Sequence, residues 1–310
     1  MANFRRLVVL SRHICPRKSY SSVTGVANTL QRKQLSSSSS TSGTDDTVIT
    51  EKQGNIFLIG LNRPANRNAV NRETAFRLRL AFENFDKDKE LNVAVFYGVG
   101  GTFCAGYDLK ELSSYKQYST TEIKLDPYGP MGPTKMKLSK PVIAAISGYA
   151  VAGGLELAIM CDMRVAEKSA IFGVFCRRFG VPLIDGGTVR LPRLIGLSRA
   201  LDMILTGRPV NAEEALGFGL VNRVVPDGEA LQHAIGLAKH IASFPQGCMQ
   251  TDRRSAYNSV YDGKSMEDAL KFEFRTGSEV LSTESVPGAT RFVGGQGRSG
   301  TFETKESNAR

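Results

Sequence analysis

Short apolar runs and longer amphipathic segments alternate along the chain, and their spacing predicts strands and helices in turn. Apolar runs at residues 55–61, 93–97 and 141–146 predict buried strands, and residues 73–85 predict an amphipathic helix. Further strands are expected at 163–166, 170–174 and 222–225, and further helices near 188–195, at 200–205, from Asn211, and at 229–243, 247–258 and 265–281. Strand-strand-helix units recur at roughly 45 residues, which predicts an α/β fold coiled as a spiral of ββα units.

The chain is organised around residues 147–162, where a predicted strand meets a predicted helix. Gly153 and Gly154 stand at the turn, and Glu156 follows in the first helical turn. The first N–H groups of a helix lack intrahelical partners, and glycine lets a ligand approach the backbone closely. Such a turn binds negative charge, including the oxygen of a thioester carbonyl on its way to an enolate. The alternative is a tightly packed helix start in which Glu156 complements the helix dipole.

A second glycine-rich turn, at residues 100–109, follows the predicted strand at 93–97. Its pattern is the same: a buried strand, a turn rich in glycine and a polar start. Two turns of this kind can each direct one backbone N–H group to the same oxygen. The sequence therefore predicts a site for one polarised oxygen between them.

Three segments carry a specific resemblance to a known family: FCAGYDL at 103–109, AGGLELAIMCD at 152–162 and GLVNRVVP at 219–226. They are similar to the crotonase, or enoyl-CoA hydratase/isomerase, family, and the likeness runs from about Gly54 to about Arg291. The resemblance implies a crotonase-like spiral of ββα units with a C-terminal helical region. It also implies an oxyanion hole for an acyl-CoA thioester, formed here by the N–H groups of Tyr107 and Gly153.

The resemblance further implies substrate contacts from residues around these turns. In the family, the loop that corresponds to residues 66–69 lies near the pantetheine and nucleotide of CoA. Arg63 or Arg67 is therefore expected either to meet a phosphate or to be solvated. The residues expected to bind substrate are Ala105, Gly106, Asp108, Arg67, Cys176 and Gly154. The resemblance implies that the CoA thioester is the substrate and that no cofactor takes part.

Residues 112–140 form a long irregular stretch, and a loop of this length inside a compact domain is usually functional or mobile. In the family, this region walls the acyl pocket. The side chains expected either to line that pocket or to pack within the loop are Tyr115, Tyr118, Tyr128 and Met131.

Carboxylates are expected to carry any proton transfer, because the sequence has three histidines, none of them in the candidate turns, and no motif for a metal or a serine nucleophile. Glu156 matches, through its AGGLELAIMCD context, a catalytic glutamate of many enoyl-CoA hydratases. Where those enzymes have a second glutamate, this chain has Cys176. A thiol near neutral pH is a poor substitute for a carboxylate that holds a water molecule.

Asp185 is the expected replacement for the second carboxylate. Relatives that isomerise dienoyl-CoAs or displace halide from aroyl-CoAs carry an aspartate three residues before the corresponding threonine, here Thr188, or nearby. The alternative is that Asp185 caps the helix that follows it. The predicted acid/base pair is therefore Glu156 and Asp185.

Charge and composition are informative about the N-terminal part of the chain and about partners, but not about the reaction. The chain has 40 Lys and Arg against 30 Asp and Glu, a net charge of +10. Residues 1–44 hold seven of these bases, many serines and no acid, which is typical of a mitochondrial transit peptide; an untargeted disordered tail is the alternative. The remaining 33 bases nearly balance 30 acids, so nucleic acid is not an expected partner. No apolar run reaches the roughly 18 residues of a membrane span.

The predicted organisation is a leader at 1–44, a crotonase spiral at 45–255, a C-terminal helical region at 256–293 and a disordered tail at 294–310. The five cysteines form no C-x-x-C pair and are consistent with a reducing compartment such as the mitochondrial matrix. The expected activity is hydration, dehydration or double-bond isomerisation of an enoyl-CoA. The alternative is a catalytically weak or inactive protein that binds CoA esters. The family implies a homotrimer or a dimer of trimers.

Overall fold

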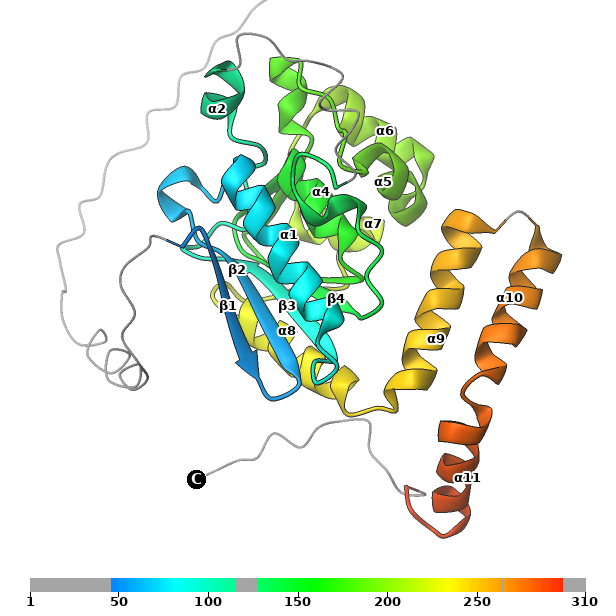
Figure 1. The fold of residues 1–310 in the computed structure, drawn as a ribbon. Coiled ribbons are helices and arrows are strands. Elements are labelled where there is room, and N and C mark those ends of the chain that lie inside the picture. The colour runs from blue at the N-terminus through cyan, green and yellow to red at the C-terminus, as the bar shows by residue number, and fades with distance from the viewer. Residues whose placement is uncertain (1–45, 115–127, 264, 298–310) are drawn as a thin grey trace, which may run out of the picture. The chain divides into compact units, whose positions relative to one another are not determined.

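The computed structural model describes residues 46–114, 128–263 and 265–297, and Figure 1 shows how their elements follow one another. The predicted leader, Tyr115, Tyr118 and residues 298–310 of the predicted tail lie outside the described residues.

The larger sheet has six strands in the order β1-β2-β3-β4-β6-β9, parallel except for the β1–β2 pair. Its strands are β1 (Val48–Gln53), β2 (Ile56–Leu61), β3 (Val93–Gly98), β4 (Val142–Ile146), β6 (Met163–Glu167) and β9 (Arg223–Val225). Strands β2 and β4 are buried along their whole length, because a sheet with both faces covered leaves no polar side.

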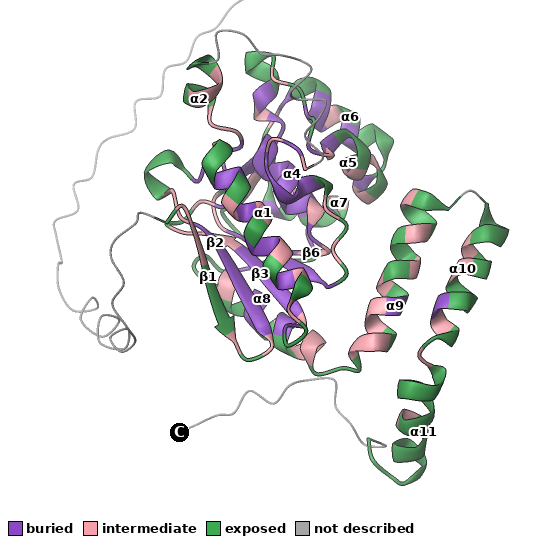
Figure 2. Cartoon of the chain, in the orientation of Figure 1, coloured by how far each residue is buried: buried purple, intermediate pink, exposed green. Residues whose placement is uncertain are grey.

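Helices cover both faces of this sheet, and successive side chains of β2 pack against different helices. Ile56 and Leu58 lie in one core cluster with the small residues of α8 (Ala230–Ala242). Phe57 faces the other way and stacks on Phe85 of α1 (Arg72–Lys87). Figure 2 shows the buried strands of this sheet beside α1 and α8, each of which is partly buried and partly exposed.

A smaller three-stranded sheet, in the order β5-β7-β8, adjoins the central turn through β5, which ends just before it. Its strands are β5 (Tyr149–Val151), β7 (Ile171–Gly173) and β8 (Val210–Asn211). The remaining helices of the spiral are α2 (Leu109–Ser114), α4 (Gly153–Met160), α5 (Gly187–Ile195), α6 (Leu197–Thr206) and α7 (Ala212–Phe218), with short 3-10 turns at Pro64–Asn66, Pro133–Lys135 and Phe175–Phe179.

Most predicted elements are present within a few residues of their expected bounds. Asn211 is the N-cap of α7, as expected, and its side chain accepts from the Glu214 N–H group at 2.8 Å. Strands β1, β5 and β8 were not predicted. β1 is an edge strand with three exposed residues and thus lacks an apolar run, whereas β5 is three residues long and merges with the glycine turn.

The C-terminal region is helical, as expected, and contains α9 (Gln246–Tyr257), α10 (Met266–Ser278) and α11 (Val286–Val293). The boundary predicted at residue 255 falls inside α9. This helix is tied to the spiral by Asp162, whose carboxylate accepts from Arg253 Nε at 2.7 Å and from the Tyr257 hydroxyl at 3.0 Å. Among the described helices, none combines the length and the apolar character needed to span a bilayer.

Replacement of Gly154 by alanine tests the tightest packing of α4. A Cβ atom there would lie 2.1 Å from the Cys104 carbonyl oxygen, so backbone must move, and we expect a loss of at least about 2 kcal/mol in the free energy of unfolding. The matched control is Gly236→Ala in α8, where a Cβ atom meets nothing within 4 Å. This control is expected to gain about 0.5–1 kcal/mol from helix propensity. Equal effects of the two substitutions in denaturant unfolding would contradict the packing argument.

Candidate active site

The central turn places the N–H group of Gly153 at the N-terminus of α4. Gly153 is the first residue of this helix, so its N–H precedes the intrahelical bonds. Ala152 before it has φ 53° and ψ −126°, a conformation that costs a residue with a side chain on the order of 1–3 kcal/mol. Its own N–H donates to the Gly173 carbonyl at 2.9 Å, which holds this strained turn against β7.

The second turn brings Tyr107 to the same place. Val70 donates to the Gly106 carbonyl and accepts from the Asp108 N–H, both at 2.8 Å. In such a parallel bridge these groups flank Tyr107, so its own N–H points away from Val70. Gly106 has φ 103°, and a Cβ atom on it would lie 3.1 Å from the Gly153 nitrogen. The structure therefore brings the two predicted donor turns into contact.

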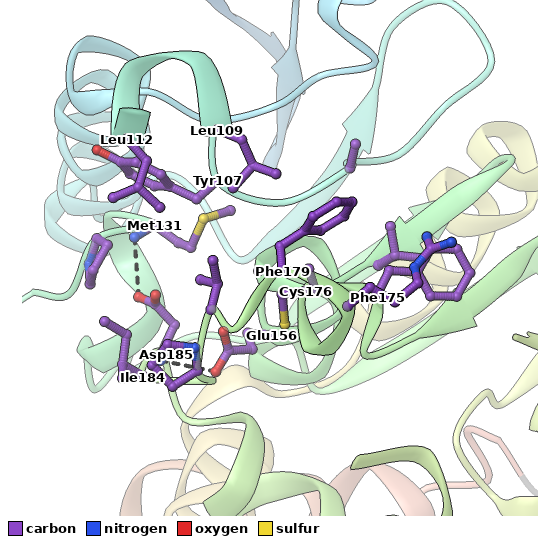
Figure 3. A pocket seen from close by; sticks show the side chains of 18 of the residues that line it. Tyr107, Leu109, Leu112, Met131, Glu156, Phe175, Cys176, Phe179, Ile184 and Asp185 are labelled. Atoms are coloured by element: carbon purple, nitrogen blue, oxygen red, sulfur yellow. Dashed lines mark hydrogen bonds between the residues drawn. The ribbon is translucent and has the colours of Figure 1, made fainter. Parts of the chain in front are cut away.

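A cavity of about 700 Å³ opens beside the two turns, and Figure 3 shows the side chains that line it. Its wall is mostly apolar and includes Met131, one of the side chains expected there. The other residues predicted for the site that line it are Arg67, Ala105, Tyr107, Gly153, Glu156, Cys176 and Asp185.

Three residues expected to bind substrate, Gly106, Asp108 and Gly154, are not among those that line this cavity. Asp108 pairs with Arg63 at 3.1 Å and accepts from the Lys110 N–H at the start of α2. Gly154 packs against the Cys104 backbone and Gly106 against the Gly153 turn, so both serve the close approach of the turns. Tyr128 does not line the cavity either, since its ring lies under the Arg79 guanidinium at 4.6 Å.

Glu156 is 2% exposed and is held by backbone of the segment that leads into α5. Its Oε1 atom accepts from the Asp185 N–H at 2.9 Å and from the Gly187 N–H at 2.8 Å. These donors belong to a different helix start, so Glu156 does not serve as a dipole complement within α4. Burial, and next the charge of Asp185, raise the pKa of Glu156 to about 7, although the two N–H donors oppose the shift.

Asp185 is 3% exposed, and its Oδ1 atom accepts from the Thr134 hydroxyl at 2.5 Å and from the Met131 N–H at 3.1 Å. The N-cap of α5 is Gly186, which has no side chain to cap the helix, and the N–H of Gly187 in its first turn donates to Glu156 instead. The helix-cap alternative for Asp185 is therefore wrong. Its carboxylate instead joins the segment before α5 to the 3-10 turn at Pro133–Lys135 (Figure 3).

Two residues near this carboxylate pair were not singled out from the sequence. Thr134 is fully buried and donates to Asp185, and Arg190 donates to the backbone carbonyls of Asp185 at 3.1 Å and Thr134 at 2.5 Å. Arg190 thereby clamps the two segments together. Positions 134 and 185 are too far apart in sequence for spacing to reveal the contact. Within the described part of the chain, no group of three or more His, Cys, Asp or Glu side chains is arranged to hold a metal ion.

Comparison with known proteins agrees with this architecture. The family model described as enoyl-CoA hydratase/isomerase matches residues 51–298. Enoyl-CoA hydratase EchA19 of Mycobacterium tuberculosis is 34% identical over 251 residues, 79% of this chain and 93% of its own length. A probable mitochondrial enoyl-CoA hydratase of Dictyostelium discoideum is 34% identical over 248 residues, 80% of this chain and 88% of its length.

Solved structures agree too. The crystal structure of enoyl-CoA hydratase EchA1 from Mycobacterium marinum superposes with a TM-score of 0.74 at 32% identity, covering 80% of this chain and 96% of that one. The fold is thus that of the crotonase class, as the sequence predicted. The chain belongs to the enoyl-CoA hydratase/isomerase family and is an acyl-CoA enzyme of the hydratase/isomerase type.

The raised pKa of Glu156 makes the stability of the protein depend on pH. Between the ordinary value of 4.5 and about 7, the folded protein holds a proton that the unfolded chain has released, so this group's contribution falls as the pH rises. Glu156→Gln removes the ionisation. We expect the variant to gain stability relative to the wild type through this interval, by up to about 3 kcal/mol above pH 7. Chemical denaturation at several pH values measures the difference, and a difference independent of pH would contradict the assignment.

Proposed function

We propose that the cavity binds an α,β-unsaturated CoA thioester with its carbonyl oxygen between the N–H groups of Tyr107 and Gly153. Both groups come from turns that touch one another, which supports their acting on a single oxygen. Charge that develops on this oxygen as the thioester becomes an enolate is stabilised by donors that are already oriented. The thioester is itself the substrate, and the proposal requires no cofactor.

Glu156 moves the proton at the α carbon. Its Oε1 atom is fixed by two N–H donors, and among the described residues no hydrogen bond reaches Oε2. The side chain lines the cavity, so Oε2 is the oxygen that serves the substrate. A pKa of about 7 suits a group that both takes and returns a proton near neutral pH.

Asp185 moves the second proton, at a carbon further along the acyl chain, and the reaction is double-bond isomerisation. The observation that supports this proposal is that two buried carboxylates line one cavity. They are also linked, because Glu156 Oε1 accepts from the backbone N–H group of Asp185. Burial, and next the charge of Asp185, raise the pKa of Glu156 to about 7, so near neutral pH Glu156 is protonated in part of the molecules and ionised in the others. One carboxyl group then accepts a proton while the other donates.

Hydration is the second candidate, because the relatives carry the name enoyl-CoA hydratase. Here Asp185 would hold the water with Glu156, since burial and the neighbouring Glu156 raise the pKa of the Cys176 thiol and keep it neutral. Incubation with a panel of enoyl-CoAs in deuterated water separates the two reactions. Deuterium at the α carbon without net hydration supports isomerisation, whereas rapid formation of a 3-hydroxyacyl-CoA supports hydration.

The family and composition also support two proposals about the protein as a whole. Exposed apolar side chains on the C-terminal helices, among them Phe274 and Val293, favour assembly into trimers or a dimer of trimers, which sedimentation equilibrium tests. The acid-free, arginine- and serine-rich residues 1–44 favour import into the mitochondrial matrix, which localisation of the full chain and of residues 45–310 tests.

Glu156→Gln and Asp185→Asn are each expected to lower kcat on the true substrate by about 10²–10⁴-fold, because each removes one proton-transfer group. Both changes keep the size of the side chain and an oxygen for the N–H or hydroxyl donors. Near-normal turnover by a folded Asp185→Asn protein would leave Asp185 with a purely structural role at the 3-10 turn.

Gly153→Val tests the oxyanion donor. A Cβ atom at this position lies 2.6 Å from the Met131 sulfur, so the side chain must displace either Met131 or the start of α4. We expect turnover to fall by about 10²–10³-fold, as for the loss of one oxyanion donor. Circular dichroism and thermal unfolding establish that the variant is folded. A folded variant with wild-type turnover would show that the Gly153 N–H does not stabilise the enolate.

A further inference from the structure

Cys176 is the one cysteine among the described residues whose side chain lines the cavity. It lies in the 3-10 turn at Phe175–Phe179 and is 8% exposed. Glu156 lines the same cavity, and Figure 3 shows the Cys176 sulfur on the side of Glu156; the charge of Glu156 acts on the thiol. A thiol and a carboxylate therefore face the same space, in which the acyl chain of a bound thioester must lie.

The other described cysteines have different surroundings. Cys104 and Cys161 are at most 2% exposed, and the Cys161 thiol donates to the Leu157 carbonyl at 3.4 Å. Cys248 is exposed on α9 and does not line the cavity. The chain thus contains a surface thiol that can serve as an internal control for Cys176.

The surroundings of Cys176 hold its thiol in the protonated form. Burial, and next the negative charge of Glu156, raise the pKa of Cys176. A protonated thiol is a weak nucleophile toward reagents from solution. An adjacent base changes this, because it removes the proton as the sulfur attacks. Glu156 is such a base, since its Oε2 atom is not engaged by the two backbone donors that fix Oε1.

We propose that Cys176 adds reversibly to the β carbon of α,β-unsaturated CoA thioesters bound in this cavity, so that the enzyme captures its most electrophilic substrates as covalent thioethers. The inference rests on the proposed function, namely that the cavity binds such thioesters. The shortest acceptors, in which the β carbon carries no substituent, react fastest because the sulfur meets the least steric hindrance.

The atoms and electrons of this step balance without any further reactant. The Cys176 sulfur forms a bond to the β carbon, and the thiol proton passes to Glu156. The π electrons of the Cα=Cβ bond move toward the carbonyl, and the resulting enolate oxygen is held by the Tyr107 and Gly153 N–H groups. Glu156 then delivers the proton to the α carbon. The product is a saturated 3-thioether of the acyl-CoA, and removal of the same α proton reverses the addition.

Because Cys176 lines the cavity, it restricts which thioesters the enzyme turns over. A thioester that isomerises or hydrates quickly leaves before the sulfur reacts. One that lacks a γ carbon, such as acryloyl-CoA, cannot isomerise, and it stays against the thiol unless it is hydrated first. The cavity is then occupied by its own substrate, and turnover of other thioesters stops until the adduct reverts.

Mass spectrometry of the full chain incubated with acryloyl-CoA tests the proposal. We expect the intact mass to rise by one whole acryloyl-CoA, and peptide mapping after acid quenching to place the addition on Cys176. Cys176→Ser is expected to abolish this addition, and the matched variant Cys248→Ser to leave it unchanged. Glu156→Gln is expected to slow it by about 10²-fold or more, because the proton acceptor is lost.

Butyryl-CoA, a saturated thioester, separates failure of this inference from failure of the proposed function. It has no Cα=Cβ bond to which the sulfur can add, so it is expected to raise the melting temperature of both the wild type and Cys176→Ser and to protect Cys176 from acryloyl-CoA. Binding of butyryl-CoA without any adduct on Cys176 would overturn the inference alone. Addition mainly to Cys248, or labelling of Cys176 that butyryl-CoA does not slow, would overturn it as well. Absence of butyryl-CoA binding would overturn the proposed function with it.

Discussion

The contact between two backbone turns is the constraint on which the rest of the site depends. Residues 104–106 and the start of α4 approach so closely that a Cβ atom on Gly106 or Gly154 would meet backbone atoms at 3.1 or 2.1 Å. This contact positions both proposed oxyanion donors and fixes the axis of α4. Because Glu156 lies in the first turn of that helix, the same contact places its carboxylate. The proposed donors and the proposed base are thus positioned by one packing arrangement rather than by separate loops.

Much of the fold and part of the site follow from sequence because their signals are local. Buried strands such as β2 and β4 are continuous apolar runs, and the Gly153–Gly154 turn carries its donor and Glu156 within four residues. Strand β1 has no such signal, since an exposed edge strand need not be apolar. Asp108 and Gly154, which were expected to bind substrate, do not line the cavity, because proximity in a motif does not tell which side of a backbone turn faces it.

The hydrogen-bond partners around Asp185 could not be predicted from the sequence, for a different reason. Thr134 and Arg190 act through contacts that span 51 and 56 residues of sequence, and a threonine or an arginine has no local pattern that reveals them. The choice between helix cap and cavity carboxylate depended on these contacts. Arg190 donates to two carbonyls rather than to a carboxylate, so its positive charge moderates the repulsion between Glu156 and Asp185 without neutralising either by direct pairing.

The residues of the proposed site are far apart in the sequence, and this affects how the protein becomes active as it folds. Tyr107, Gly153 and Asp185 come from three separate stretches of chain, and no two of them lie within one local element. Long-range contacts of this kind form late, after the entropy of loop closure has been overcome. A partly folded chain therefore has no binding site, and a thioester ligand stabilises only the complete spiral. The concentration of acyl-CoA in the compartment then helps to determine how much of the newly folded protein persists.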